Sequence, residues 1–194
     1  MNMFFLKPLA ITLALSGCLG TPDPQLLTQA DLDAFNLNFA AAETGSYNGP
    51  VPTGTATYSG HSLFYVSRTD GVSDFRAAVL GDIGMDVNFD TSTITGSIDN
   101  MVMGDEDGNT SNVGGSLVVD ASGYGTVRFP SADVDGMLSM YVDGSARNVT
   151  MDMALAGIIR DNPALADTIT GTLTGTGSGD VSLVLDSGSF YATD

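Results

Sequence analysis

The sequence has few of the residues that usually carry chemistry or cross-links: its 194 residues include one cysteine, one histidine and no tryptophan. A lone cysteine has no partner within the chain, so no intramolecular disulfide can form. Stability must therefore come from a hydrophobic core and from hydrogen-bonded backbone alone.

Positive charge is also scarce. Six basic residues stand against 23 acidic ones, which gives a formal net charge of −17. A field of this sign repels nucleic acid and anionic lipid head groups, so a role in binding polyanions is disfavoured. The acidity indicates a solvated surface that resists aggregation, and a dedicated basic partner is the alternative explanation.

The N-terminus carries an apolar run that is too short for a membrane-spanning helix, which needs about 20 residues. The segment "MNMFFLKPLAITLALSGC" has one cation, Lys7, then apolar residues and small residues before Cys18. This order is typical of a signal peptide. The ending "LSGC" resembles the lipobox of bacterial lipoproteins, in which the cysteine becomes the first residue and carries acyl chains. We therefore expect residues 1–17 to be a lipoprotein signal peptide and Cys18 to be lipidated.

A tether and one short helix are predicted between Cys18 and residue 53. The tether, "LGTPDPQ", contains proline and glycine. Thr28 and Asp31 have the spacing of a capping box, and Leu32, Phe35 and Phe39 then recur at helical spacing. The breaker-rich segment "TGSYNGPVPTG" leads from this helix into a different pattern.

From residue 54 onward the apolar period is two, which is typical of strands with one buried and one wet face. The predicted inward residues are Ala56, Tyr58, Phe64, Val66; Ile83, Met85, Val87, Phe89; Leu138, Met140, Val142; Val149, Met151, Met153, Leu155; Ile169, Leu173; Val181, Leu183 and Leu185. Turns are predicted at Asp70-Gly71, Asp107-Gly108, Asp135-Gly136 and Asp143-Gly144, with a hairpin tip at "GTGSGD".

This many antiparallel strands must close or fold over, because open edges invite pairing with other chains. Glycines within strands, at Gly84, Gly96, Gly157 and Gly171, indicate bulges or bends of the kind that closure needs. We therefore predict an all-β fold for residues 54–194: an antiparallel up-and-down β-barrel of about eight strands, in preference to a sandwich. A transmembrane barrel is disfavoured because predicted outward positions carry Asp and Thr.

Several segments resemble the strand signatures of the barrel domain of the transferrin-binding protein B family. They are "VPTGTATYSG", "DVNFDTSTITGSID" and "DNPALADTITGTLTG", and the ending "SGSFYAT" is similar to that family's closing strand. The resemblance covers Pro52 to Asp194, as one barrel where the family has two lobes. It implies a barrel-bearing bacterial lipoprotein, on the cell surface or in the periplasm, that binds a host protein or a nutrient carrier. No binding residue of the family can be assigned to a residue here.

The sole histidine, His61, is expected on the strand face opposite Tyr58. A catalytic histidine needs a positioned nucleophile and an orienting carboxylate, and no Gly-x-Ser-x-Gly elbow occurs in the chain. We therefore interpret His61 as a polar strand residue. The sequence predicts no catalytic residue, no cofactor and no enzymatic activity.

The segment "GDEDGNTSN" gathers three carboxylates, Asp105, Glu106 and Asp107. Oxygen ligands of this kind suit calcium. However, an EF-hand loop counted from Asp105 needs glycine and glutamate where this chain has Thr110 and Ser116. We predict a hydrated hairpin loop without a metal, with weak calcium binding as the alternative. Because binding residues concentrate on loops of a rigid frame, Asp105, Glu106 and Asp107 are the candidate ligand contacts.

Together these features favour a binding protein, attached to the outer membrane by its N-terminal lipid, on either the periplasmic or the cell-surface face. Its expected ligand is a protein or a small nutrient, and nucleic acid is not an expected partner. The alternative is a structural envelope lipoprotein without a specific ligand.

Overall fold

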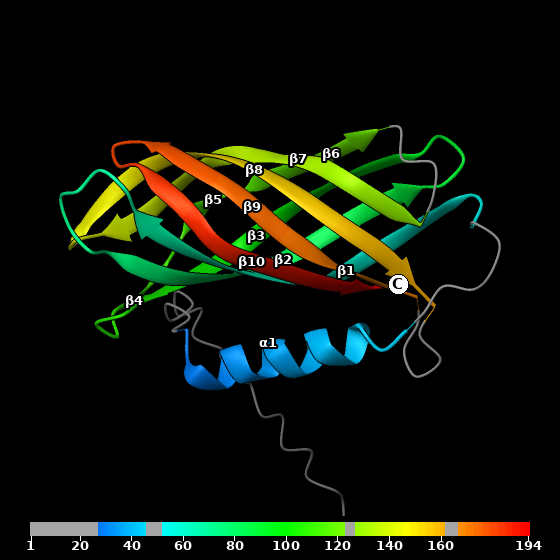
Figure 1. The fold of residues 1–194 in the computed structure, drawn as a ribbon, viewed down its shortest axis with the longest axis horizontal. Coiled ribbons are helices and arrows are strands. Elements are labelled where there is room, and N and C mark those ends of the chain that lie inside the picture. The colour runs from blue at the N-terminus through cyan, green and yellow to red at the C-terminus, as the bar shows by residue number, and fades with distance from the viewer. Residues whose placement is uncertain (1–26, 46–51, 123–126, 162–166) are drawn as a thin grey trace, which may run out of the picture.

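The computed structural model describes residues 27–45, 52–122, 127–161 and 167–194. In this part of the chain a closed β-barrel is accompanied by one helix (Figure 1). The predicted signal peptide, Cys18 and the tether after it lie outside the described residues. The described helix is not long and apolar enough to cross a membrane.

Eight strands form the wall of the barrel in the order β1-β2-β3-β6-β7-β8-β9-β10, and antiparallel pairing of β1 with β10 closes it. Their bounds are β1 Thr55–Arg68, β2 Arg76–Asn88, β3 Thr93–Asp105, β6 Leu117–Ser122, β7 Arg128–Val142, β8 Ser145–Arg160, β9 Thr168–Gly179 and β10 Leu183–Thr193. Two short strands, β4 (Thr110–Asn112) and β5 (Gly114–Gly115), pair with β3 and β7. The predicted up-and-down barrel is confirmed.

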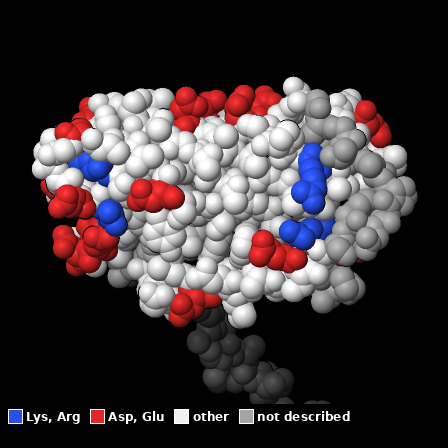
Figure 2. Space-filling view, in the orientation of Figure 1, with Lys and Arg blue, Asp and Glu red and all other residues white. Residues whose placement is uncertain are grey.

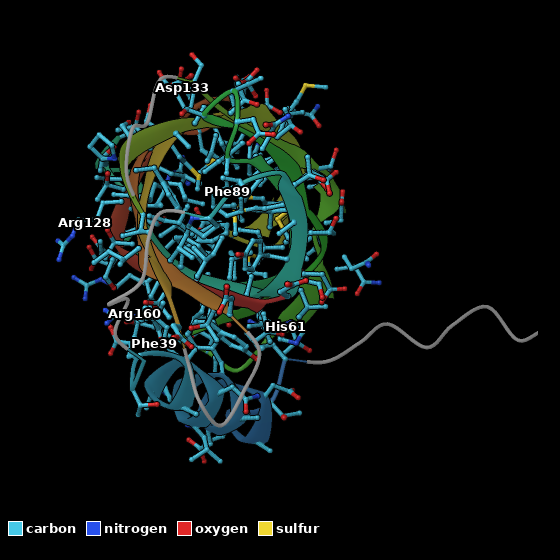
Figure 3. All side chains as sticks on the ribbon, turned by 90° about the vertical axis from the view of Figure 1, so that its right-hand side faces the viewer. Phe39, His61, Phe89, Arg128, Asp133 and Arg160 are labelled. Atoms are coloured by element: carbon cyan, nitrogen blue, oxygen red, sulfur yellow. The ribbon has the colours of Figure 1, made fainter. Side chains whose placement is uncertain are left out.

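Alternate residues of the strands point into the barrel, as the period of two predicts. On β8, Val149 and Met151 are fully buried, whereas the alternate residues Thr150 and Asp152 are exposed. Side chains fill the interior (Figure 3), and the largest fully buried ones are aromatic: Tyr58, Phe64, Phe129 and Phe190. Burying each such side chain contributes about 1.5–3 kcal/mol, so the interior acts as a core.

The predicted inward residues are confirmed, with partial exceptions at Ala56 near the start of β1, which is half-buried against the core, and at the end of β2. Phe89 lies just beyond that strand and is half-buried against the core. Of the strand methionines, Met137 is 65% exposed, whereas Met140 and Met151 are buried. Methionine therefore fills the core mainly where the strand period turns it inward.

The strand glycines mark close approaches more often than bulges. The prediction for Gly84, Gly96 and Gly171 is a bulge or a bend, and their regular ladders exclude the bulge. A Cβ at Gly96 would lie 2.2 Å from a carbonyl oxygen on the neighbouring strand, and one at Gly171 would lie 2.0 Å from another. Of the four predicted positions, only Gly157 lies beside a register shift, which falls between Phe129 and Ala132 of β7.

Most of the predicted turns are confirmed. Asp143-Gly144 joins β7 to β8 with φ values of 50° and 74°, the left-handed pair that a two-residue hairpin favours. Asp70-Gly71 and Asp107-Gly108 also lie in connections.

The turn predicted at Asp135-Gly136 is wrong, because this pair lies inside β7. A Cβ at Gly136 would lie 2.3 Å from the carbonyl oxygen of Ser116, so glycine serves close strand contact there. The segment "GTGSGD" lies largely within β9 rather than at a hairpin tip.

The predicted helix is confirmed as α1 (Gln29–Ala42), which begins after the N-cap Thr28. The backbone N–H of Asp31 donates to Thr28 Oγ1, and the Asp31 carboxylate accepts from the Thr28 backbone N–H at 2.8 Å. These reciprocal bonds are the predicted capping box. Hydrogen bonds from the Thr28 side chain and backbone hold the pKa of Asp31 below its usual value.

Helix α1 packs on the outside of the barrel, below the strands in Figure 1. The ring centroids of Phe35 and of Tyr191 on β10 are 5.5 Å apart, and Asn38 Nδ2 donates to the Tyr191 hydroxyl at 3.1 Å. Outward residues Leu63 of β1 and Ala78 of β2 complete this second apolar cluster. At Leu63 and Ala78 these strands are therefore buried on both faces.

Candidate functional site

The acidic loop, residues 105–109, connects β3 to β4. The Asp105 carboxylate accepts hydrogen bonds from the Asn109 backbone N–H at 2.8 Å and from the Asn109 side-chain amide at 3.0 Å and 3.2 Å. Gly108 has a left-handed φ of 81°, which closes the turn. Asp105 thus stabilises the loop, while Glu106 and Asp107 are exposed.

The acidic loop borders a hollow of about 420 Å³ at one end of the barrel, which we call the acidic hollow. The β1–β2 connection and the β7–β8 turn form its other walls. Its carboxylates are Asp74, Asp105, Glu106, Asp107 and Asp143. Acidic side chains crowd the left end of the face shown in Figure 2. Arg76 is the one cation in this lining, so negative charge predominates and the hollow favours cations.

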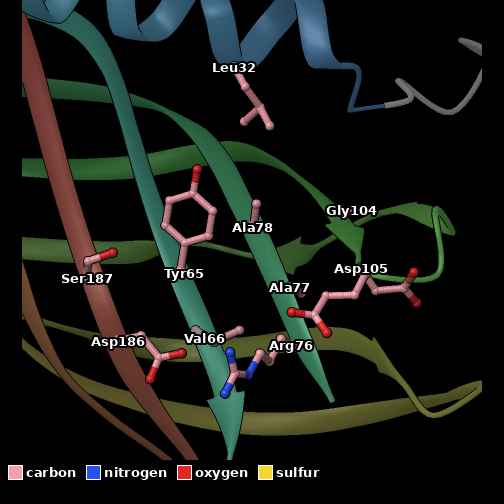
Figure 4. A pocket seen from close by; sticks show the side chains of 11 residues that line it. Leu32, Tyr65, Val66, Arg76, Ala77, Ala78, Gly104, Asp105, Asp186 and Ser187 are labelled. Atoms are coloured by element: carbon pink, nitrogen blue, oxygen red, sulfur yellow. The ribbon is translucent and has the colours of Figure 1, made fainter. Parts of the chain in front are cut away.

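A second hollow, about 490 Å³, lies between α1 and the outer faces of β1, β2, β3 and β10; we call it the helix groove (Figure 4). Leu32 covers it from the helix, and the cross-strand pair Tyr65 and Ala78 forms part of its floor. The Tyr65 side chain is 40% exposed. The helix groove and the acidic hollow share Arg76, Asp105 and Glu106, so they adjoin.

An ion-pair network stabilises the walls of the acidic hollow. Arg68 Nε donates to Asp70 at 2.6 Å, and its Nη1 donates to Asp143. Ser73 Oγ donates to the same Asp143 carboxylate at 2.8 Å. The hydrogen bond with Asp70 is the main reason why the pKa of Arg68 is raised, and the same bond lowers the pKa of Asp70. The network joins the β1–β2 connection to the β7–β8 turn, which orders both.

His61 lies on the outer face of β1, opposite the inward Tyr58, as predicted. Its Nδ1 pairs with Asp82 of β2 at 3.1 Å, and Asn100 Nδ2 donates to the same carboxylate at 3.0 Å. The imidazole and the Tyr191 ring pack edge to face, with their ring centroids 5.8 Å apart. The two strands place His61 directly opposite Asp82, so this is a contact between cross-strand partners on an exposed face.

In the part of the chain that the structure describes, no three His, Cys, Asp or Glu side chains are grouped so as to hold a metal ion. The acidic loop fits this finding, because Asp105 is directed at its own turn by Asn109. The three predicted contact residues do come together: Asp105 and Glu106 line both hollows, and Asp107 lines the acidic hollow.

Sequence reasoning missed the helix groove and the position of Arg76. A signal for the groove is present, since "LFYV" in β1 and "AAVL" in β2 are unbroken apolar runs. Such runs are typical of strands that are covered on both faces, whereas the alternating pattern predicts strands with one buried face. Nothing local in the sequence places Arg76 beside the acidic loop.

Comparison of the chain with family models, with curated proteins and with solved structures finds no match in any of the three.

Proposed function

We propose that this chain is a lipid-anchored lipoprotein of the bacterial outer membrane that binds a protein or small nutrient ligand at the acidic end of its barrel. The observation that carries the proposal is the pair of adjoining hollows with a common wall of Arg76, Asp105 and Glu106. The interior is packed with side chains, which leaves the outer surface for a ligand.

The chemistry of the two hollows favours a basic protein surface as the partner. The helix groove offers apolar contact at Leu32 and the exposed ring of Tyr65. The acidic hollow next to it offers the carboxylates of Glu106 and Asp107. An apolar centre with a charged rim is the usual anatomy of a protein interface. A partner with basic side chains around an apolar or aromatic group would fit both.

The proposed anchor would hold this end near the membrane. Leu27, the first described residue, packs at the acidic end, with its Cδ2 3.5 Å from the Cβ position of Gly104. Cys18 precedes Leu27 by nine residues, and an extended chain of that length spans about 30 Å. The partner would thus be met within about 30 Å of the lipid surface.

The test is association kinetics with a variant that keeps shape and removes charge. Asp105→Asn, Glu106→Gln and Asp107→Asn together should slow association with a basic partner captured from extract, and the difference should fade at high salt. The matched control is Asp120→Asn, Asp133→Asn and Asp135→Asn, three exposed aspartates on β6 and β7. Both variants lose three negative charges, so only position differs.

Equal on-rates for the two variants at low salt would contradict the proposal. So would the absence of any captured partner, and that result would favour the structural envelope lipoprotein. Thermal unfolding of each variant is the folding control, because Asp105 also stabilises its own turn.

A further inference from the structure

A third hollow lies at the other end of α1, away from the acidic loop. It measures about 590 Å³ and runs between the C-terminal half of the helix and the outer faces of β7, β8 and β9. Phe39 borders it from the helix, and Ala156 and Ile158 of β8 form part of its floor. We call it the arginine groove. Its size lies within the about 300–1,000 Å³ typical of small-molecule sites.

The outer face of β8 changes character in the arginine groove. Nearer its start β8 turns Asn148, Thr150 and Asp152 outward, and all three are exposed. From there the outward residues are Ala154, Ala156 and Ile158, which are half-buried. Small and aliphatic side chains on an outward strand face provide an apolar floor against which a hydrocarbon group can pack.

Two arginines border this apolar floor. Arg128 of β7 and Arg160 of β8 line the groove, together with a single carboxylate, Glu43. Figure 3 shows Arg128, Arg160 and Phe39 on the same side of the molecule. The whole chain has six basic residues against 23 acidic ones, so two cations on one apolar groove invert the local charge balance.

Arg160 is held in place by neutral partners. Its Nε donates to Thr170 Oγ1 at 3.0 Å, and its Nη1 donates to the carbonyl oxygen of Gly45 at 3.0 Å. Among the described residues it forms no ion pair, although the chain is rich in carboxylates. A guanidinium has five N–H groups, and these two bonds to described residues use two of them. An oriented guanidinium bonded to neutral oxygens is well suited to receive an anion.

We propose that the arginine groove binds a small amphiphilic carboxylate, with its carboxylate on Arg160, near the positive charge of Arg128, and its hydrocarbon body along Ala156 and Ile158 toward Phe39. This site is separate from the acidic hollow, since the two share no lining residue and attract opposite charges. Binding here therefore does not depend on the function proposed for the acidic end.

The test uses decanoate as the probe, titrated into the full chain by calorimetry and followed by the methyl NMR signals of Ala156 and Ile158. Saturable one-to-one binding is expected, with decanol, which lacks the charge, and acetate, which lacks the chain, each at least about tenfold weaker. Arg160→Gln and Ala156→Leu should each weaken decanoate binding by about tenfold. Thr95→Glu, an exposed position on β3, shifts the net charge by the same one unit as Arg160→Gln and should leave binding unchanged.

Equal affinity for decanol and decanoate, or no saturable binding of decanoate, would overturn the proposal. Tighter binding of decyl phosphate than of decanoate would overturn the choice of a carboxylate. Arg160→Gln could also loosen the contact with Gly45, so its fold is checked by circular dichroism. If that variant does not fold, wild-type affinity in Ala156→Leu would by itself refute the site.

Discussion

The packing of Phe129 against Gly157 allows a sharp test of the barrel core. The two residues are cross-strand partners on β7 and β8. A Cβ added at Gly157 would lie 2.3 Å from Phe129 Cζ and 3.0 Å from Phe190 Cζ. Both rings are buried, with exposed fractions of 1% and 0%. Gly157→Ala must therefore displace an aromatic ring in a full core.

The expected magnitude follows from this clash. Overpacking a core by one methyl group costs about 1–3 kcal/mol, and the lower entropy of the unfolded alanine chain offsets up to about 1 kcal/mol of it. Gly157→Ala should thus destabilise the barrel by about 1–2 kcal/mol. Phe129→Ala should cost about 3–5 kcal/mol through its cavity. In the double variant the new methyl group occupies part of that cavity, so the combined loss should be smaller than the sum by about 1 kcal/mol or more.

Urea unfolding followed by far-ultraviolet circular dichroism measures these differences, since the chain has no tryptophan for fluorescence. Gly84→Ala is the matched control, because no atom lies within 4 Å of its Cβ position and its φ is not left-handed. It should leave stability unchanged or raise it by up to about 1 kcal/mol. Equal midpoints for Gly157→Ala and Gly84→Ala, or strict additivity in the double variant, would refute the packing argument.

Three further predictions concern Asp167 just before β9, the helix cap and the anchor. Burial, with smaller contributions from Asp161 and Asp194, raises the pKa of Asp167 in the folded state, so its ionised form disfavours folding. Asp167→Asn should raise the urea midpoint at pH 7, and this gain should vanish as the pH falls below about 3.9, the ordinary aspartate pKa. Thr28→Ala should lower the free energy of unfolding by about 1 kcal/mol through the lost cap. Because Thr28 lowers the pKa of Asp31 in the folded state, this difference in unfolding free energy should shrink as the pH falls from about 3.9 through the folded pKa of Asp31, as measured by urea titration. Cys18→Ser should shift the protein from the membrane fraction to the soluble fraction on cell fractionation, and an unchanged distribution with unchanged mass would contradict lipidation.

The strands could be predicted because alternation is a local property of the chain. Val149, Met151 and Met153 lie on one face of β8 whatever the partner strands are, since side chains alternate along any strand. The turns show the limit of local signals. Asp143-Gly144 and Asp135-Gly136 are the same dipeptide, yet the first makes a hairpin and the second lies within a strand. Strand pairing decides between them, and pairing is not local.

The candidate site divides in the same way. The sequence identified Asp105, Glu106 and Asp107 as a solvated acidic turn, because charged residues beside a glycine after a strand favour a loop. It contained no sign that Arg76 would share their hollows. Residues far apart in the chain meet only when the strands pair in register and the barrel closes.

By itself the sequence determined the period of most wall strands, the capping box at Thr28 and the acidity of the surface, since these depend on neighbours a few residues apart. The tertiary structure decided that α1 lies on the outside of the barrel, over the outward apolar residues of β1 and β2. It also decided where the three hollows open and placed Arg160 at one of them, held by Thr170 and Gly45. The physical reason is that burial on a second face and the meeting of charges depend on which surfaces are brought into contact, and that is settled only when the whole chain packs.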